Sequence, residues 1–209
     1  GTYALDDNTT GGQNTAVGYD ALGANSTGVY NTGVGTNALR SNTTANNNTA
    51  VGWSALNANT TGTSNTAVGR GALQVHENGN SCTAVGTNAL DASTTASSNT
   101  AVGTSALGST TTGGSNSAVG NSALSANTTG QFNNAVGVGC LDANTTGGSN
   151  TGMGHNTLGA NTTAANNSAF GFNAMLLNTT GTENVAVGAY ALDANTTASY
   201  NTAVGHDSM

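Results

Sequence analysis

The stretch NTAVGWSALNANTTG, which runs from Asn48 to Gly62, is one copy of a unit that recurs along the whole chain. An apolar residue followed by Gly returns every 17 residues, and Leu or Met comes four residues after each of these glycines. Twelve units and five further residues make up the 209 positions, without an insertion. The recurring positions are predicted to form structural ladders, represented by Val17, Val34 and Val51, by Gly18, Gly35, Gly52, Gly69 and Gly86, by Leu22, Leu39 and Leu56, and by Asn14, Asn31 and Asn48.

A period held without slippage indicates that each residue stacks on its counterpart in the next unit. Surface loops would otherwise tolerate insertions. Parallel strands stacked along one axis, with one coil per unit, satisfy this requirement. Helical repeats are disfavoured, because Gly and Asn recur at fixed places in every unit. We therefore predict an all-β parallel β-solenoid that forms a single repeat domain over residues 1–209.

Two strands are predicted in each unit. The residues from Asn14 to Gly18 form the first, and the region of Ala21 and Leu22 forms the second. Residues 25–28 are predicted to turn, because Asn, Ser and Gly favour turns. The unbroken column of glycines at the Gly18 position indicates either a positive φ or the close approach of another backbone.

The same pattern predicts a sister chain. Neighbouring residues of a strand face opposite sides, yet the position of Ala16 is always small and that of Val17 always apolar. One buried face would line the coil and the other would lie against a neighbour. We expect a homo-oligomer, a homotrimer sharing one axis, with end-to-end joining into a filament as a further option. A bulge that turns both residues inward is the alternative.

The composition argues against several classes of partner. The chain has a formal net charge of −7, and its only cationic side chains besides His are Arg40 and Arg70. Nucleic-acid binding needs clustered Lys and Arg, so it is not expected. An anionic membrane surface is disfavoured for the same reason, and no run of 18 apolar residues would allow membrane insertion.

The units from Asn14 to Gly28 and from Asn48 to Gly62 resemble the NTAVGxxAL repeats of bacterial surface fibres and phage tail-fibre proteins, often found upstream of an intramolecular chaperone domain. They are more distantly similar to the head repeats of trimeric autotransporter adhesins, whose NSVAIG motif has a shorter period. The first resemblance covers the whole chain. It implies a homotrimeric fibre that is extracellular, on a cell surface or on a virion, without identifying which fibre.

No catalytic constellation is apparent, and we expect neither enzymatic activity nor a cofactor. Asp6, Asp91, Asp142 and Asp193 follow the Leu of their units. The last three are three units apart, about 14 Å, which is too far for paired carboxylates or one calcium shell. Solvated surface is their expected place. The adjacent Asp6 and Asp7 are a weak candidate for binding a cation.

His155 and His206 share one position of the unit, whereas His76 lies in the turn. Exposed histidines and no metal site are expected, although three copies of one His around a trimer axis could ring an ion. Cys82 and Cys140 lie more than three units apart, too far to form a disulfide. Both are predicted to be buried free thiols.

Nine NTT or NST triplets, including those at Asn25 and Asn59, fit the N-glycosylation pattern. Glycans on successive coils about 4.8 Å apart would collide, so stacked ladders of Asn and Thr explain the triplets better, and sparse glycosylation stays open. The Thr columns also raise ice binding as a rival function. Adjacent residues such as Thr60 and Thr61 should point in opposite directions, which argues against a flat Thr array.

The expected function is that of a passive shaft. The pattern starts at Gly1 and stops at Met209 without a distinct cap, which indicates a segment of a longer fibre. Large residues after the Gly column, such as Tyr19 and Trp53, are scattered rather than gathered in a patch. Contact with a host or surface receptor is therefore expected outside this segment.

Overall fold

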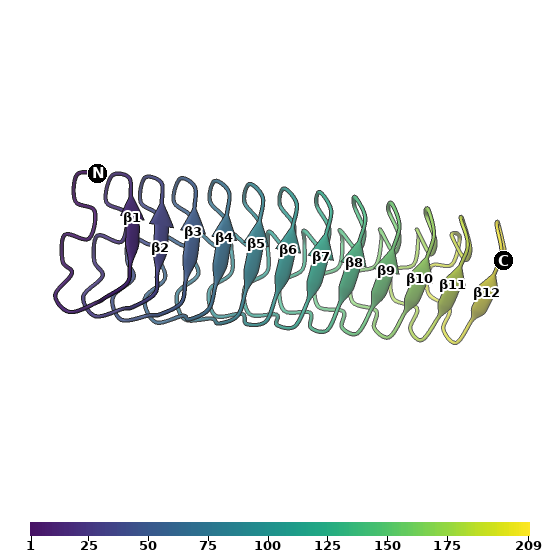
Figure 1. Cartoon of the computed structure of the whole chain (residues 1–209). Helices are drawn as coiled ribbons and strands as arrows, with labels where there is room; N and C mark the ends of the chain where they lie inside the picture. Colours follow the sequence, from purple (N-terminus) through teal and green to yellow (C-terminus); the bar gives the residue numbers. More distant parts are fainter.

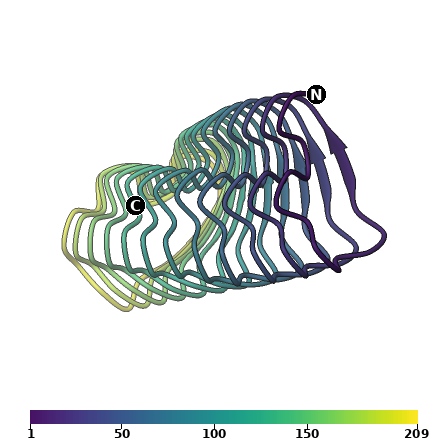
Figure 2. The ribbon, with the colours of Figure 1, turned by 90° about the vertical axis from the view of Figure 1, so that its left-hand side faces the viewer.

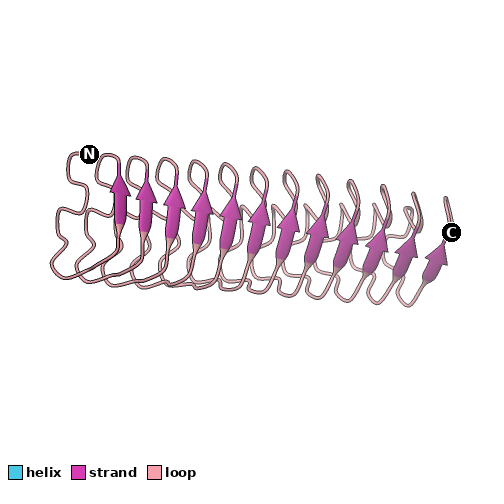
Figure 3. Cartoon of the chain, in the orientation of Figure 1, coloured by secondary structure: helices cyan, strands magenta, loops and turns pink.

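The computed structural model describes residues 1–209 as one all-β parallel solenoid without a helix. The coils follow one another along a rod, with the termini at opposite ends (Figure 1). Each strand has three residues and belongs to one 12-stranded sheet (Figure 3). The strands are β1 (Thr15–Val17), β2 (Thr32–Val34), β3 (Thr49–Val51), β4 (Thr66–Val68), β5 (Thr83–Val85), β6 (Thr100–Val102), β7 (Ser117–Val119), β8 (Asn134–Val136), β9 (Thr151–Met153), β10 (Ser168–Phe170), β11 (Val185–Val187) and β12 (Thr202–Val204).

Neighbouring strands pair in parallel with an offset of one unit. Thr15 of β1 lies beside Thr32 of β2, and Val17 lies beside Val34. The same order continues to β12 without a crossover, and the view along the rod shows successive coils repeating one outline (Figure 2). The prediction that 17 residues make one coil is thereby confirmed. The strand itself is shorter than the predicted span from Asn14 to Gly18.

The second strand predicted around Ala21 and Leu22 is wrong. Leu22 has a φ of 51°, which is left-handed backbone that an extended strand does not contain. Its side chain is fully buried, and its N–H donates to the carbonyl of Ala38 in the next coil at 2.9 Å. Left-handed backbone costs roughly 1–2 kcal/mol for a residue with a Cβ, which the roughly 1.5–3 kcal/mol from burying Leu offsets. The equivalent Leu39 and Leu56 have φ values of 52° and 50°.

The glycine column combines both features inferred from the sequence. Gly18 has a φ of 136°, and a Cβ on it would lie 2.5 Å from the carbonyl oxygen of Gly35 in the next coil. Gly52 repeats the arrangement, with a φ of 139° and the same 2.5 Å approach to Gly69. Only Gly adopts this backbone without strain. The column therefore has both a positive φ and a close backbone neighbour.

The apolar core is a continuous column of 30 buried residues inside the coils, all Ala or Leu except Cys82, Cys140 and Met175. Within β3, Ala50 is fully buried whereas the Val51 side chain points outward and is 38% exposed. Regular alternation therefore holds along the strand. The alternative of a bulge that turns both residues inward is wrong. Each strand therefore directs its small middle residue into the core and the larger Val to the outside.

Two buried columns of Asn complete the interior. Asn31 Nδ2 donates to the carbonyl of Ala45 at 2.8 Å, and the backbone N–H of Asn31 donates to Asn14 Oδ1 at 2.8 Å. In the second column, Asn42 Nδ2 donates to Asn25 Oδ1 at 2.8 Å. Buried amides stabilise a fold when their hydrogen bonds are satisfied. These ladders tie each coil to the next where the thin core offers little apolar surface.

Candidate functional site

The first candidate surface is the outward side of the sheet. We call it the outer sheet face and define it by the side chains of the first and third residue of each strand, β1 to β12. None of these 24 side chains is charged. The first column is mostly Thr. The second column is entirely apolar and includes Val17 at 57%, Val102 at 36% and Met153 at 49% exposure. The face therefore combines a mostly polar column with a column of exposed apolar side chains.

The predicted ladder residues do not all lie on one surface. The leucines of the set are inside the core, Asn31 and Asn48 belong to a buried amide column, and the glycines lie at the turn that follows each strand. Only the valines of the predicted set face outward. The sequence signals the outward direction of these valines, because each Val follows a small residue that points into the core. Neighbouring residues of a strand point to opposite sides.

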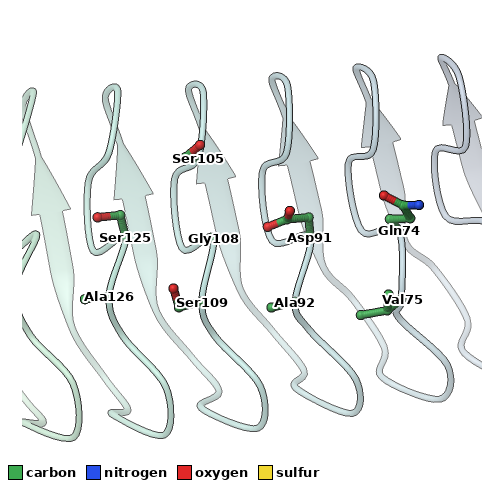
Figure 4. Close-up of a pocket in the computed structure, with 9 residues that line it drawn as sticks. All are labelled: Gln74, Val75, Asp91, Ala92, Ser105, Gly108, Ser109, Ser125 and Ala126. Atoms are coloured by element: carbon green, nitrogen blue, oxygen red, sulfur yellow. The ribbon is translucent and has the colours of Figure 1, made fainter.

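The second candidate surface is a groove on the side of the coils away from the strands. Figure 4 shows Gln74, Asp91 and Ser125 in one row and Ala92 among a second row below it, with the strands behind. Gly108 has no side chain, which leaves a gap between Asp91 and Ser125. The cavity there has a volume of about 820 Å³. We define the groove by three positions of each unit: the residue two before the Leu and the two residues after it. For Leu107 these are Ser105, Gly108 and Ser109.

The groove carries most of the acidic charge of the chain. Seven of the nine acidic residues occupy its three positions, and these are Asp6, Asp7, Asp20, Asp91, Asp142, Asp193 and Asp207. Partial burial raises the pKa of Asp91 and of Asp142. Asp91, Asp142 and Asp193 are half-buried rather than fully solvated. Charge is therefore segregated from the uncharged outer sheet face.

His155 and His206 are exposed, as expected, and they belong to a ladder of rings. His155 stacks on Phe172 with ring centroids 5.4 Å apart and an interplanar angle of 13°. Phe172 lies 5.4 Å from Tyr190, which lies 5.9 Å from His206. No group of three His, Cys, Asp or Glu side chains is placed to hold a metal ion. The expectation that large residues after the Gly column are scattered is therefore wrong for the last four coils, where one stacked and two edge-to-face pairs form a continuous ladder.

The expectation that His76 is exposed is wrong. His76 is fully buried, because it occupies the unit position that Asn25 and Asn59 fill elsewhere in the amide column. Its Nδ1 lies 3.0 Å from Ser93 Oγ, whereas its Nε2 and Asn59 Oδ1 have no hydrogen-bond partner. Burial lowers the pKa of His76. Aligning the units would have revealed this placement, since the Asn position precedes the exposed part of the turn.

Both cysteines are buried free thiols, as predicted. Cys82 stands at an Asn position, and its Sγ donates to the carbonyl of Ala96 at 3.3 Å in place of the amide. Cys140 fits because residue 152 is Gly, where a Cβ would lie 2.5 Å from the Cys140 Sγ. Burial raises the pKa of the Cys140 thiol to about 12 and also raises the pKa of Cys82. Neither thiol is a reactive nucleophile at neutral pH.

The Asn of the NTT and NST triplets is committed to hydrogen bonds. Asn59 is fully buried, and its Nδ2 donates to Asn42 Oδ1 at 2.9 Å and to the carbonyl of Gly62 at 3.0 Å. A glycan on that nitrogen would replace one of the two donated hydrogens and would have no space at a fully buried side chain. The expectation that adjacent Thr side chains of the triplets point in opposite directions is wrong for Thr60 and Thr61, because both hydroxyls donate to Asn78 Oδ1, at 3.1 Å and 2.7 Å. These residues lie in a bend rather than in a strand, so strand alternation does not apply to them.

The chain has no significant match among protein-family models, curated proteins or solved structures. It contains no helix with the length and apolar character required to cross a membrane.

Proposed function

We propose that this chain is a non-catalytic structural shaft of a fibre that is extracellular, on a cell surface or on a virion, with sister chains packed through the outer sheet face. A homotrimer with a shared axis is the arrangement we favour. The observation that carries the proposal is the column from Val17 to Val204, which is apolar in every coil and faces outward. A solitary rod would gain nothing from such a column.

The dimensions support a stable contact. Twelve strands at about 4.8 Å spacing extend for about 58 Å, and three residues span about 10 Å, so the face offers about 600 Å² per chain. Specific interfaces bury about 600–1,000 Å² per partner. Covering a Val that is two-fifths exposed contributes on the order of 1 kcal/mol. Twelve such residues contribute on the order of 10 kcal/mol, which is comparable with the cost of association.

A shaft also needs coils that resist separation, and the hydrogen bonds supply this. The chain has 134 backbone–backbone hydrogen bonds, of which only 22 lie within the strands. The others include coil-to-coil bonds in the turns, such as Ser54 N–H to the carbonyl of Thr36 at 2.9 Å. The amide columns add side-chain bonds to each step. Load along the rod is therefore shared around the whole circumference of the coil.

The proposal is tested by the mass of the native assembly, measured by light scattering after size exclusion. We expect a trimer at micromolar concentration. Val102→Asp places a charge in the middle of the outer sheet face and should yield monomers, whereas Thr95→Asp, at an exposed site outside the face, should leave the trimer intact. A monomeric parent chain, or a Val102→Asp variant that keeps the parent mass, would overturn the proposed packing.

A second candidate function is ice binding. The outer sheet face sets a half-buried Thr column beside a Val column two residues away, on a sheet of 12 evenly paired strands. The two columns lie two residues apart on one side of each strand, a spacing that the adjacent Thr60 and Thr61 lack. Thermal hysteresis of the monomeric chain would favour this function over the shaft. Its absence in a chain that is trimeric would remove it, because the trimer contact covers the same face.

A further inference from the structure

A second cavity of about 590 Å³ opens in the groove where the first three coils meet. Its lining includes two tyrosines, three aspartates and one arginine. We propose that this cavity binds an organic ammonium group, such as the head of a quaternary amine. The inference is independent of the shaft function, because the groove lies away from the outer sheet face.

The aromatic part of the site is a corner of two rings. Tyr3 and Tyr19 come from adjacent coils, and their ring centroids lie 5.6 Å apart with the rings at 86° to each other. Tyr3 is 53% exposed and Tyr19 is 51% exposed, so the rings present free surface to the cavity. Perpendicular aromatic walls attract an alkylammonium ion through the ring quadrupole. They offer no comparable attraction to an anion.

The floor of the site is built by an ion pair. Arg40 Nε lies 2.6 Å from Asp20 Oδ2, and the Asp20 side chain is only 18% exposed. Gly23 makes this possible, since a Cβ at that position would overlap the Asp20 carboxylate. The pair fixes both side chains against the coil. It also leaves the cavity open above Gly23.

The charge in the cavity selects a cation. Arg40 neutralises Asp20 through the ion pair, whereas Asp6 and Asp7 are exposed and form no ion pair. Two unpaired carboxylates beside two aromatic rings favour a bulky, weakly hydrated cation. A small metal ion would require a converging set of ligands, and none is present.

The other groove cavity, around Asp91, provides an internal comparison. Asp91 occupies the same position of the unit as Asp6, and both line a groove cavity. No aromatic residue lines the cavity at Asp91. A carboxylate alone in the groove should therefore bind an ammonium ion far more weakly than the tyrosine-lined cavity.

The test mixes the full chain with choline chloride as the probe. Binding is measured by NMR saturation transfer from the protein to the choline methyl protons. We expect a dissociation constant of about 1 mM. Tyr19→Ala should weaken binding about tenfold, because one wall of the corner is lost. Tyr19→Phe should bind as the parent chain does. Circular dichroism of each variant establishes that the solenoid is intact.

The charge contribution is tested with the double variant Asp6→Asn and Asp7→Asn, which should weaken binding, against Asp91→Asn as the matched control, which should not. An absence of saturation transfer at about 10 mM choline would overturn the proposal. So would equal weakening by Tyr19→Ala and Asp91→Asn, which would assign the binding to diffuse groove charge. Competition by Mg²⁺ as effective as competition by tetramethylammonium would exclude an aromatic site.

Discussion

Replacing His76 by Asn restores the residue that the amide column has at Asn25, Asn42 and Asn59, and we expect the variant to be more stable than the parent chain. In this column the parent leaves two buried atoms without partners, Asn59 Oδ1 and His76 Nε2. An Asn at position 76 would donate from Nδ2 to Asn59 Oδ1, as Asn42 donates to Asn25 Oδ1 at 2.8 Å.

The magnitude follows from the hydrogen bonds exchanged. Each buried unsatisfied group costs about 1–3 kcal/mol, and the substitution satisfies one and removes the other. It also loses the 3.0 Å contact between His76 Nδ1 and Ser93 Oγ, which is worth about 1 kcal/mol, and it leaves space where the larger ring was. We expect a net gain of about 1–2 kcal/mol at neutral pH. For a chain of this size that raises the melting temperature by about 2–8 °C.

The pH dependence gives a second, sharper signature. Burial lowers the pKa of His76 in the folded chain, so the folded state prefers the neutral imidazole. The stability contributed by that preference is complete above the unfolded pKa of about 6.5 and is lost as the pH falls below it, through the lowered folded value. The advantage of His76→Asn should therefore grow from about pH 8 to about pH 5. Glu77 follows in the chain but is exposed and screened.

The assay is thermal melting followed by circular dichroism at both pH values, with His155→Asn as the control. His155 is exposed, so its substitution should leave the pH dependence of melting unchanged. If parent and His76→Asn lose stability in parallel on acidification, the acid sensitivity has another origin. If the variant melts below the parent at every pH, the gain from completing the amide column is smaller than the packing lost with the ring.

Three further predictions concern the backbone, a thiol and the Asn triplets. Gly86→Ala should lower the melting temperature strongly, since Gly86 has a φ of 137° and a Cβ would meet the Gly103 carbonyl at 2.5 Å; Gly12→Ala, with open space around the Cβ, should be nearly neutral. Cys140, with a pKa of about 12, should resist a thiol reagent at about pH 8 until denaturant is added, and rapid labelling of the folded chain would refute its burial. Asn59 should stay unmodified after expression in a glycosylating host, and a glycan detected there by mass spectrometry would contradict the buried amide column.

The sequence predicted the stacking because a repeat of constant length places equivalent residues of successive coils above one another. Gly18 and Gly35 occupy equal places, and the structure places their backbones in contact. The outward column could be anticipated from Val51 beside Ala50, because a strand residue faces the side opposite to its neighbour. Register and the two sides of the strand were therefore predictable without coordinates.

The conformation at Leu could not be predicted in the same way. Left-handed backbone is typical of Gly, Asn and Asp. Leu gives no such signal, so the sequence predicts extended backbone at Ala21 and Leu22. Tertiary packing overrides local preference here, because only the turned backbone directs Leu22 into the core while its N–H reaches the next coil. The groove was missed for a related reason. It depends on where the turn carries Asp91 and Gly108, not on their residue types.

The low charge of the chain follows from the stacking that holds it together. Like charges in one column of neighbouring coils would be about 4.8 Å apart, where their repulsion amounts to about 1–3 kcal/mol for partly solvated groups. Three coils of separation, about 14 Å, exceed the screening length of physiological salt. Asp91, Asp142 and Asp193 share a column at intervals of 51 residues, which is three units, and no column has acidic residues in consecutive units. Like charges can therefore share a column of this solenoid only at intervals of several coils, and seven of the nine acidic residues lie in the groove rather than on the outer sheet face.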